Sequence, residues 1–260
     1  MRSRLATAAL LAAAALGLAA CGGSTSGAPT TSAPAGPTGT ITVLAAASLT
    51  ESFTEIGQQF EAANPGTKVV FSFGPSSGLA TQITEKAPAD VFASASTKTM
   101  QTVVDAGDAA GPSTFAVNTM IIATPAEPSE AVTSLQDLTN PDVKTAVCAA
   151  DVPCGVAADA LFEKNKLAVT PVTREVDVKA VLSKVQLGEV DAGIVYVTDV
   201  KGSGGAVNGI EIPADENVTT DYPIATLTSS ANSVTAQAFV DFVLSAAGQK
   251  VLADAGFSAP

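Results

Sequence analysis

Short apolar segments alternate with helical patterns along the chain from residue 41 to the C-terminus. Apolar residues at helical spacing, such as Leu49, Phe53, Ile56 and Phe60, predict the helices. Glycine and proline mark several of their ends, as in residues 64–66 (NPG). Strands that alternate with helices are typical of parallel sheets covered by helices. The sequence therefore predicts an α/β fold.

The expected elements follow from these patterns. The expected helices cover residues 49–63, 77–86, 97–105, 153–162 and 178–185, with two more pieces in 236–255 separated near Gly248. The expected strands and extended segments are 41–48, 69–73, 90–93, 115–124, 143–148, 172–176, 192–197 and 224–227.

Two strand-to-helix turns share one design. Residues 41–48 (ITVLAAAS) end in small residues and Ser48, and residues 69–77 (VVFSFGPSS) place Ser76 and Ser77 before the next helix. Such turns leave backbone N–H groups free at a helix N-terminus, where the helix dipole favours an anion. Other readings remain open, because residues 48–51 (SLTE) match a capping box and Ser76 and Ser77 could be ordinary turn residues.

The N-terminal residues 1–21 have the pattern of a cleaved leader. Arg2 and Arg4 precede an apolar run that is too short to span a membrane comfortably. The run ends in residues 18–21 (LAAC), which resemble the lipobox of bacterial lipoproteins, so we expect a lipid on Cys21; an ordinary secretory signal with a chance cysteine is the alternative. Residues 22–39 contain only Gly, Ser, Thr, Ala and Pro, a composition that predicts a flexible tether.

Charge and composition exclude several functions. The formal net charge is −12, which argues against nucleic acid and against a polybasic membrane contact. The chain has no histidine, so a Ser-His-Asp or Cys-His mechanism is excluded, and it contains no P-loop motif. Asp90 and Asp191 precede strands and leave a paired-carboxylate glycosidase open, although a chain with no Trp and two Tyr offers few sugar platforms. We expect no enzymatic activity.

The cysteines add one structural prediction. With Cys21 lipidated, Cys148 and Cys154 form an even pair in an oxidising compartment, and we expect a disulfide between them. Two separate buried thiols are the alternative. A zinc site is not expected, because two thiols without histidine are too few ligands.

Several segments together resemble the substrate-binding proteins of molybdate ABC transporters. These are residues 41–50 (ITVLAAASLT), 74–83 (GPSSGLATQI), 87–93 (APADVFA), 151–155 (DVPCG) and 193–196 (GIVY). The resemblance implies the two-lobed, type II periplasmic-binding-protein fold, with two Rossmann-like lobes joined by two crossing strands. The lobes would be residues 40–118 with 225–260 and residues 119–224, and the crossings would be 115–124 and 222–227.

The resemblance also implies an oxyanion site in the cleft, made of uncharged donors from both lobes. The matching groups are the hydroxyls of Ser48, Ser76 (with Ser77 as its neighbour) and Tyr196, and the backbone N–H groups of Cys154 and Val178. Cys154 departs from the small residue usual in the family, but only its backbone is required. Taken singly, Tyr196 could be a core tyrosine and Val178 the first apolar residue of a helix.

The implied function is high-affinity binding of molybdate, and of tungstate, for delivery to the permease and ATPase of an ABC importer. The resemblance implies a monomer outside the cytoplasm, held at the cell membrane by the lipid on Cys21, with no cofactor and no direct metal ligand. A binding protein for another small oxyanion such as sulfate, a hydrolase and a structural lipoprotein are the alternatives.

A donor-only site has a consequence for selectivity. Phosphate is partly protonated at neutral pH, and a buried proton without an acceptor costs about 1–3 kcal/mol. Molybdate, tungstate and sulfate are fully deprotonated. We therefore expect phosphate to be rejected by hydrogen-bond mismatch, and sulfate by size.

Overall fold

The computed structural model describes residues 36–127 and 131–260. The expected leader, Cys21 and most of the expected tether lie outside these residues. The tether was expected to run to residue 39, but Gly39 already begins the first strand. Thr38 is also held, because its backbone N–H donates to Thr235 Oγ1 at 3.0 Å and its carbonyl accepts from the same hydroxyl at 2.7 Å.

Nine strands of the described residues form one continuous mixed sheet, in the order β2-β1-β3-β9-β4-β7-β5-β6 with β8 beside β4. They are β1 (Gly39–Ala46), β2 (Thr67–Gly74), β3 (Val91–Ala93), β4 (Ser113–Pro125), β5 (Thr145–Cys148), β6 (Thr173–Glu175), β7 (Ala192–Tyr196), β8 (Val207–Glu211) and β9 (Thr219–Thr226). The pairs β1–β2, β1–β3, β5–β6 and β5–β7 are parallel, as expected. Strands β4 and β9 pair antiparallel with each other, β9 pairs antiparallel with β3, and β4 pairs antiparallel with β7 and β8.

The helices of the described residues cover both ends of this sheet. They are α1 (Thr50–Ala63), α2 (Ser76–Thr84), α3 (Thr97–Asp105), α4 (Pro153–Lys164), α5 (Val178–Gln186), α6 (Val197–Gly202), α7 (Ser233–Leu244) and α8 (Ala246–Ala255), with short 3-10 helices at Ala47–Leu49 and Leu135–Thr139. None of the helices in this part of the chain is long and apolar enough to cross a membrane.

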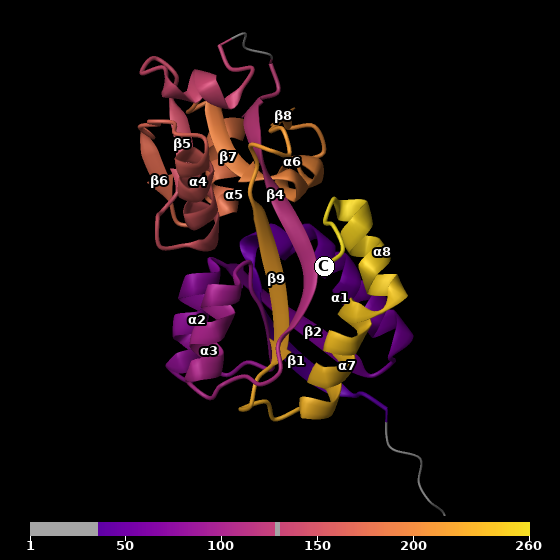
Figure 1. The fold of residues 1–260 in the computed structure, drawn as a ribbon. Helices are drawn as coiled ribbons and strands as arrows, with labels where there is room; N and C mark the ends of the chain where they lie inside the picture. The colour runs from indigo at the N-terminus through magenta and orange to yellow at the C-terminus, as the bar shows by residue number, and fades with distance from the viewer. Residues whose placement is uncertain (1–35, 128–130) are drawn as a thin grey trace, which may run out of the picture. The chain divides into compact units, whose positions relative to one another are not determined.

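The described residues fold into two lobes (Figure 1). Each lobe has its own hydrophobic core. The first lobe consists of β1–β3 with α1–α3, α7 and α8; its core includes Phe53, Phe60 and Phe239, whose rings meet edge-on. The second lobe consists of β5–β8 with α4–α6, and its core contains Val147, Leu161 and Ile194. This arrangement is the expected two-lobed α/β fold.

Strands β4 and β9 run from one lobe into the other, side by side (Figure 1). At one end β9 pairs with β3 of the first lobe, and at the other end β4 pairs with β7 of the second lobe. The crossing segments expected from the sequence are confirmed, although β9 begins at Thr219 and so starts earlier than expected.

Some local expectations were wrong. The C-terminal helices separate at Ser245, whose hydroxyl caps α8, and Gly248 lies inside α8. Glycine is needed there because a Cβ would lie 2.4 Å from the Phe242 carbonyl oxygen. Strand β8 was not expected at all, because its sequence (VNGIE) has no alternating apolar pattern. In the structure only the first of its residues is buried.

Candidate functional site

A small cavity of about 20 Å³ lies where the two lobes face each other. Its lining includes the small residues Ala46, Ala47, Gly74 and Ala95 of the first lobe and Val152, Pro153 and Asp177 of the second. Five of the six residues expected from the sequence also line it, namely Ser48, Ser76, Cys154, Val178 and Tyr196. Ser77 does not; it lines a separate surface pocket with Thr81 and Asp151, because the next residue of a helix points to another side.

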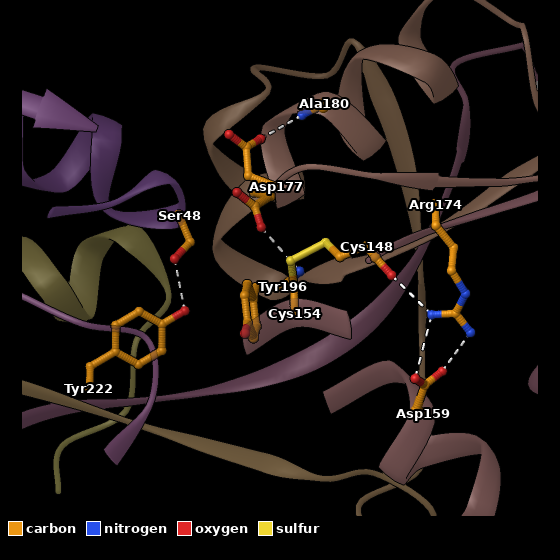
Figure 2. The surroundings of a disulfide bond; sticks show 10 residues. Ser48, Cys148, Cys154, Asp159, Arg174, Asp177, Ala180, Tyr196 and Tyr222 are labelled. Atoms are coloured by element: carbon orange, nitrogen blue, oxygen red, sulfur yellow. Dashed lines mark hydrogen bonds and ion pairs between the residues drawn. A yellow bond between two sulfur atoms is a disulfide. The ribbon is translucent and has the colours of Figure 1, made fainter. Parts of the chain in front are cut away.

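Ser48 lies in the 3-10 turn that joins β1 to α1. Its side chain is buried, and its Oγ lies 2.9 Å from the hydroxyl oxygen of Tyr222 (Figure 2). The residue that precedes α1 is Leu49, and no side-chain cap is present there. The capping-box alternative for Ser48 is therefore wrong: its hydroxyl contacts Tyr222 on the crossing strand β9, and Ser48 lines the pocket.

Ser76 is the first residue of α2, directly after Pro75. Its Oγ accepts a hydrogen bond of 3.0 Å from the backbone N–H of Ala95, which follows β3. No acceptor among residues 36–127 and 131–260 takes the Ser76 hydroxyl proton. A hydroxyl that already accepts one bond and has a free proton is well suited to donate into the cavity.

Cys154 is the second residue of α4 and is bonded to Cys148 at the end of β5 (Figure 2). The expected disulfide is thus present, and the alternative of two separate thiols is wrong. Gly155 follows, and a Cβ at that position would lie only 1.8 Å from the Ala149 carbonyl oxygen. The disulfide and this close approach together hold the N-terminus of α4 against the pocket.

Val178 begins α5, and Asp177 caps that helix by accepting from the Ala180 N–H at 2.9 Å. The Val178 N–H, as the first of the helix, has no intrahelical acceptor. Asp177 was not among the expected site residues. Its place could have been found from the sequence, because Asp before a helical pattern is a typical N-cap.

Tyr196 ends β7 and is almost completely buried. Its hydroxyl forms no hydrogen bond of good geometry with the described residues, although Thr220 and Tyr222 lie close to it. Burial raises the pKa of Tyr196, so the hydroxyl keeps its proton at neutral pH. A buried hydroxyl without a partner, at the edge of a cavity, is a donor available to a ligand.

Charged side chains lie beside the pocket, in a cluster of Glu51, Lys179 and Asp199. Lys179 Nζ lies 2.8 Å from Glu51 Oε2 and 3.1 Å from Asp199 Oδ1. Because Glu51 belongs to α1 and Lys179 to α5, this cluster joins the two lobes. None of the described residues that line the pocket has a cationic side chain.

The pKa values in this cluster follow from burial and pairing. Burial raises the pKa of Asp199 to about 6, with Lys179 opposing the shift. Burial by itself would lower the pKa of Lys179, but the two carboxylates together raise it. Lys179 therefore stays charged and compensates the buried carboxylate.

Asp90 and Asp191 do not form a carboxylate pair. Asp90 Oδ2 accepts from the Thr42 N–H at 2.7 Å in the first lobe, and Asp191 Oδ2 accepts from the Lys144 N–H at 2.8 Å in the second. Neither residue lines the pocket. Both carboxylates connect neighbouring strands, and nothing in their placement supports the glycosidase alternative. The described residues also contain no group of three or more His, Cys, Asp or Glu that could hold a metal ion.

Known proteins match this chain over most of its length. The molybdate-binding protein ModA of Mycobacterium tuberculosis (strain H37Rv) is 44% identical over 230 residues, which cover 87% of this chain and 88% of that protein. The fold matches the periplasmic molybdate-binding protein of Azotobacter vinelandii with a TM-score of 0.76 at 20% identity, covering 85% of this chain and 99% of that one. It also matches the sulfate-binding protein SubI of Mycobacterium tuberculosis with a TM-score of 0.75 at 17% identity, covering 85% and 86%.

These comparisons separate what the fold shows from what the sequence shows. One of these two solved structures is a molybdate-binding protein and the other is a sulfate-binding protein, and their TM-scores are similar. The fold therefore does not distinguish one oxyanion from another. The family model described as bacterial extracellular solute-binding protein matches residues 41–258, which include every residue of the pocket. The chain therefore belongs to the bacterial extracellular solute-binding proteins.

Proposed function

We propose that this protein binds molybdate, and tungstate, in the pocket between its lobes and delivers the anion to an ABC importer. The observation that carries the proposal is that two serine hydroxyls, a buried tyrosine hydroxyl and two helix N-termini surround one small cavity. The identity of 44% to a molybdate-binding relative supports the choice of anion. As a member of a solute-binding family, the protein acts in transport without catalysis.

The size and chemistry of the cavity favour a compact anion. Its volume of about 20 Å³ is far below the roughly 300–1,000 Å³ of pockets that hold drug-sized organic ligands. The proposed donors are the hydroxyls of Ser48, Ser76 and Tyr196 and the backbone N–H groups of Cys154 and Val178. Helix N-termini bind anions through free N–H groups and the helix dipole, so no positive side chain is required.

The hinge and the membrane attachment complete the proposal. Residues 40–118 with 225–260 would move as one lobe against 119–224 through bending of β4 and β9. The monomer would be held at the outer face of the cell membrane by a lipid on Cys21, next to the permease and ATPase that receive the anion. The lipobox-like sequence supports the anchor, and mass spectrometry of the membrane-bound protein checks it.

Calorimetry with molybdate, tungstate, sulfate and phosphate tests the choice of ligand. Molybdate and tungstate should bind tightly, sulfate weakly because it is smaller, and phosphate weakly because its proton lacks an acceptor. Tight sulfate binding without molybdate binding would favour the sulfate alternative. Tight phosphate binding would contradict the donor-only site, and Asp177, whose carboxylate is in the lining, would then be the first acceptor to test by mutation.

Replacing Ser76 by alanine should weaken molybdate binding at least about tenfold, the effect of losing about 1.4 kcal/mol. The variant removes a donor to the anion and the acceptor of the Ala95 N–H. Titration calorimetry measures the change. Thr81→Ala is the matched control, because Thr81 lies on the exposed side of the same helix and bonds only within it. An unchanged affinity in Ser76→Ala would remove Ser76 from the site.

A further inference from the structure

Tyr222 lies directly behind the pocket but does not line it. It belongs to the crossing strand β9, its side chain is fully buried, and its hydroxyl oxygen lies 2.9 Å from Ser48 Oγ (Figure 2). Neither the sequence motifs nor the proposed set of donors includes it. The contact between this buried hydroxyl and Ser48, a proposed ligand group, therefore needs an explanation.

The ring of Tyr222 is held on several sides. Its centroid lies 5.2 Å from that of Phe257, 6.0 Å from that of Tyr196 and 6.2 Å from that of Phe115, each in an edge-on arrangement. These rings come from the C-terminal segment, the second lobe and the other crossing strand. The packing leaves the Tyr222 hydroxyl little freedom to move away from Ser48.

The direction of the Ser48–Tyr222 hydrogen bond decides whether Ser48 can serve a ligand. A serine hydroxyl has one proton, so if Ser48 donates to Tyr222 it has none for an anion. The Asn118 side chain on β4 also lies near the Tyr222 hydroxyl, and its amide nitrogen donates to Thr198 Oγ1 at 2.9 Å. Either hydroxyl can be the donor in the Ser48–Tyr222 bond; if Tyr222 donates while its oxygen accepts from Asn118, the Ser48 proton is left for the pocket.

We propose that Tyr222 is a positioning residue of the anion site, which fixes the Ser48 oxygen by donating to it and so turns the Ser48 proton toward the ligand. The chain of donors runs from Asn118 through Tyr222 and Ser48 to the anion, and hydrogen bonds in such chains strengthen one another. Since Asn118 and Tyr222 lie on the two crossing strands, the hinge itself orients a ligand group. This inference rests on the proposed function of the pocket.

Tyr222→Phe tests the inference because it removes the hydroxyl and keeps the ring. Its dissociation constant for molybdate should rise about fivefold, the effect of losing one neutral hydrogen bond. In a Ser48→Ala background the same change should have no effect, because the residue through which Tyr222 acts is gone. Calorimetry on the purified full chain gives all four dissociation constants of this double-mutant cycle.

The results of this cycle distinguish a failure of the positioning role from a failure of the proposed function. If the unaltered protein does not bind molybdate, the proposed function fails. If it binds, and Tyr222→Phe has no effect or has the same effect with and without Ser48, the positioning role is overturned. The chain has no Trp and two Tyr, so in Tyr222→Phe the remaining tyrosine signal comes from Tyr196 and reports whether the ligand still reaches the pocket.

A second variant keeps the test decisive if Tyr222→Phe folds poorly. Asn118→Ala removes the donor at the far end of the chain and leaves both hydroxyls in place. It should weaken molybdate binding about threefold in the unaltered background and not at all in Ser48→Ala. Equal losses in both backgrounds would show a purely structural effect and would overturn the inference.

Discussion

Replacing Gly155 by alanine should abolish tight molybdate binding and destabilise the protein by at least about 3 kcal/mol, at the upper end of the cost of overpacking. An added Cβ would lie 1.8 Å from the carbonyl oxygen of Ala149, 2.6 Å from its carbonyl carbon and 2.9 Å from the Cys148 oxygen. These are backbone atoms of the turn after β5, so they have no rotamer by which to move aside. The N-terminus of α4 must shift, and with it the Cys154 N–H that we propose as a ligand group.

The matched control is Gly78→Ala. Gly78 is the third residue of α2, as Gly155 is the third residue of α4, and both helices begin at the pocket. A Cβ at Gly78 meets only the Pro75 side chain, at 3.4 Å. We expect a neutral or slightly stabilising effect there, since alanine is the better helix former by up to about 1 kcal/mol. Urea unfolding and calorimetry measure both variants, and equal behaviour of the two would contradict the role of the close approach at Gly155.

Replacing Lys179 by methionine should destabilise the protein by about 3 kcal/mol at pH 8, the usual cost of removing one partner of a buried ion pair. Methionine keeps most of the side-chain length but leaves Asp199, which is fully buried, without its compensating charge. It also removes the ion pair between α1 and α5, both of which begin next to the pocket. Molybdate binding should therefore weaken as well, because the two lobes lose a contact with each other beside the pocket.

The stability loss caused by Lys179→Met should depend on pH. The pKa of Asp199 is about 6 in the folded protein, above its ordinary value of 3.8, so the folded state holds this proton more tightly than the unfolded state. The stability that Asp199 contributes is therefore present at low pH and is lost as the pH rises through about 4 to 6. Without Lys179 the pKa of Asp199 should rise further. The deficit of Lys179→Met should thus be larger at pH 8 than at pH 5.

Glu51→Gln is the control for the exposed arm of the cluster. The Glu51 side chain is 46% exposed, and exposed ion pairs contribute about 0–1 kcal/mol. This variant should lose less than about 1 kcal/mol at either pH. Urea unfolding at pH 5 and pH 8 measures all three proteins. A deficit of Lys179→Met that is the same at both pH values, or no larger than that of Glu51→Gln, would contradict the role of the buried carboxylate.

Local patterns predicted many elements because their causes are local. Helix α3 begins and ends at the residues expected, since Ser96 caps it and its apolar residues lie at helical spacing. The break at Ser245 was placed wrongly, because Gly248 looked like a helix stop. Its real requirement is the close approach of the Phe242 carbonyl, which depends on how α7 meets α8. Strand β8 was missed because pairing with β4, and not an apolar pattern, makes it a strand.

The candidate site likewise combines residues that were named from the sequence with contacts that only the fold creates. Its five proposed donors were named from the resemblance to the molybdate-binding family, because read singly Ser48, Tyr196 and Val178 each had an ordinary structural explanation. Whether Ser48 was a helix cap or a site residue could not be decided locally. Tyr222 is separated from it by 174 residues, and only folding brings the two hydroxyls within 2.9 Å.

The sequence by itself determined the alternation of strands and helices, because capping and periodicity are local, and it left the pairing of Cys148 with Cys154 open until the structure showed the disulfide. Only the tertiary structure decided that Ser48 faces Tyr222, that Ser77 points away from the cavity and that Lys179 joins Glu51 to Asp199 across the lobes. These contacts connect residues far apart in the chain, and burial and the geometry of the two crossing strands select them.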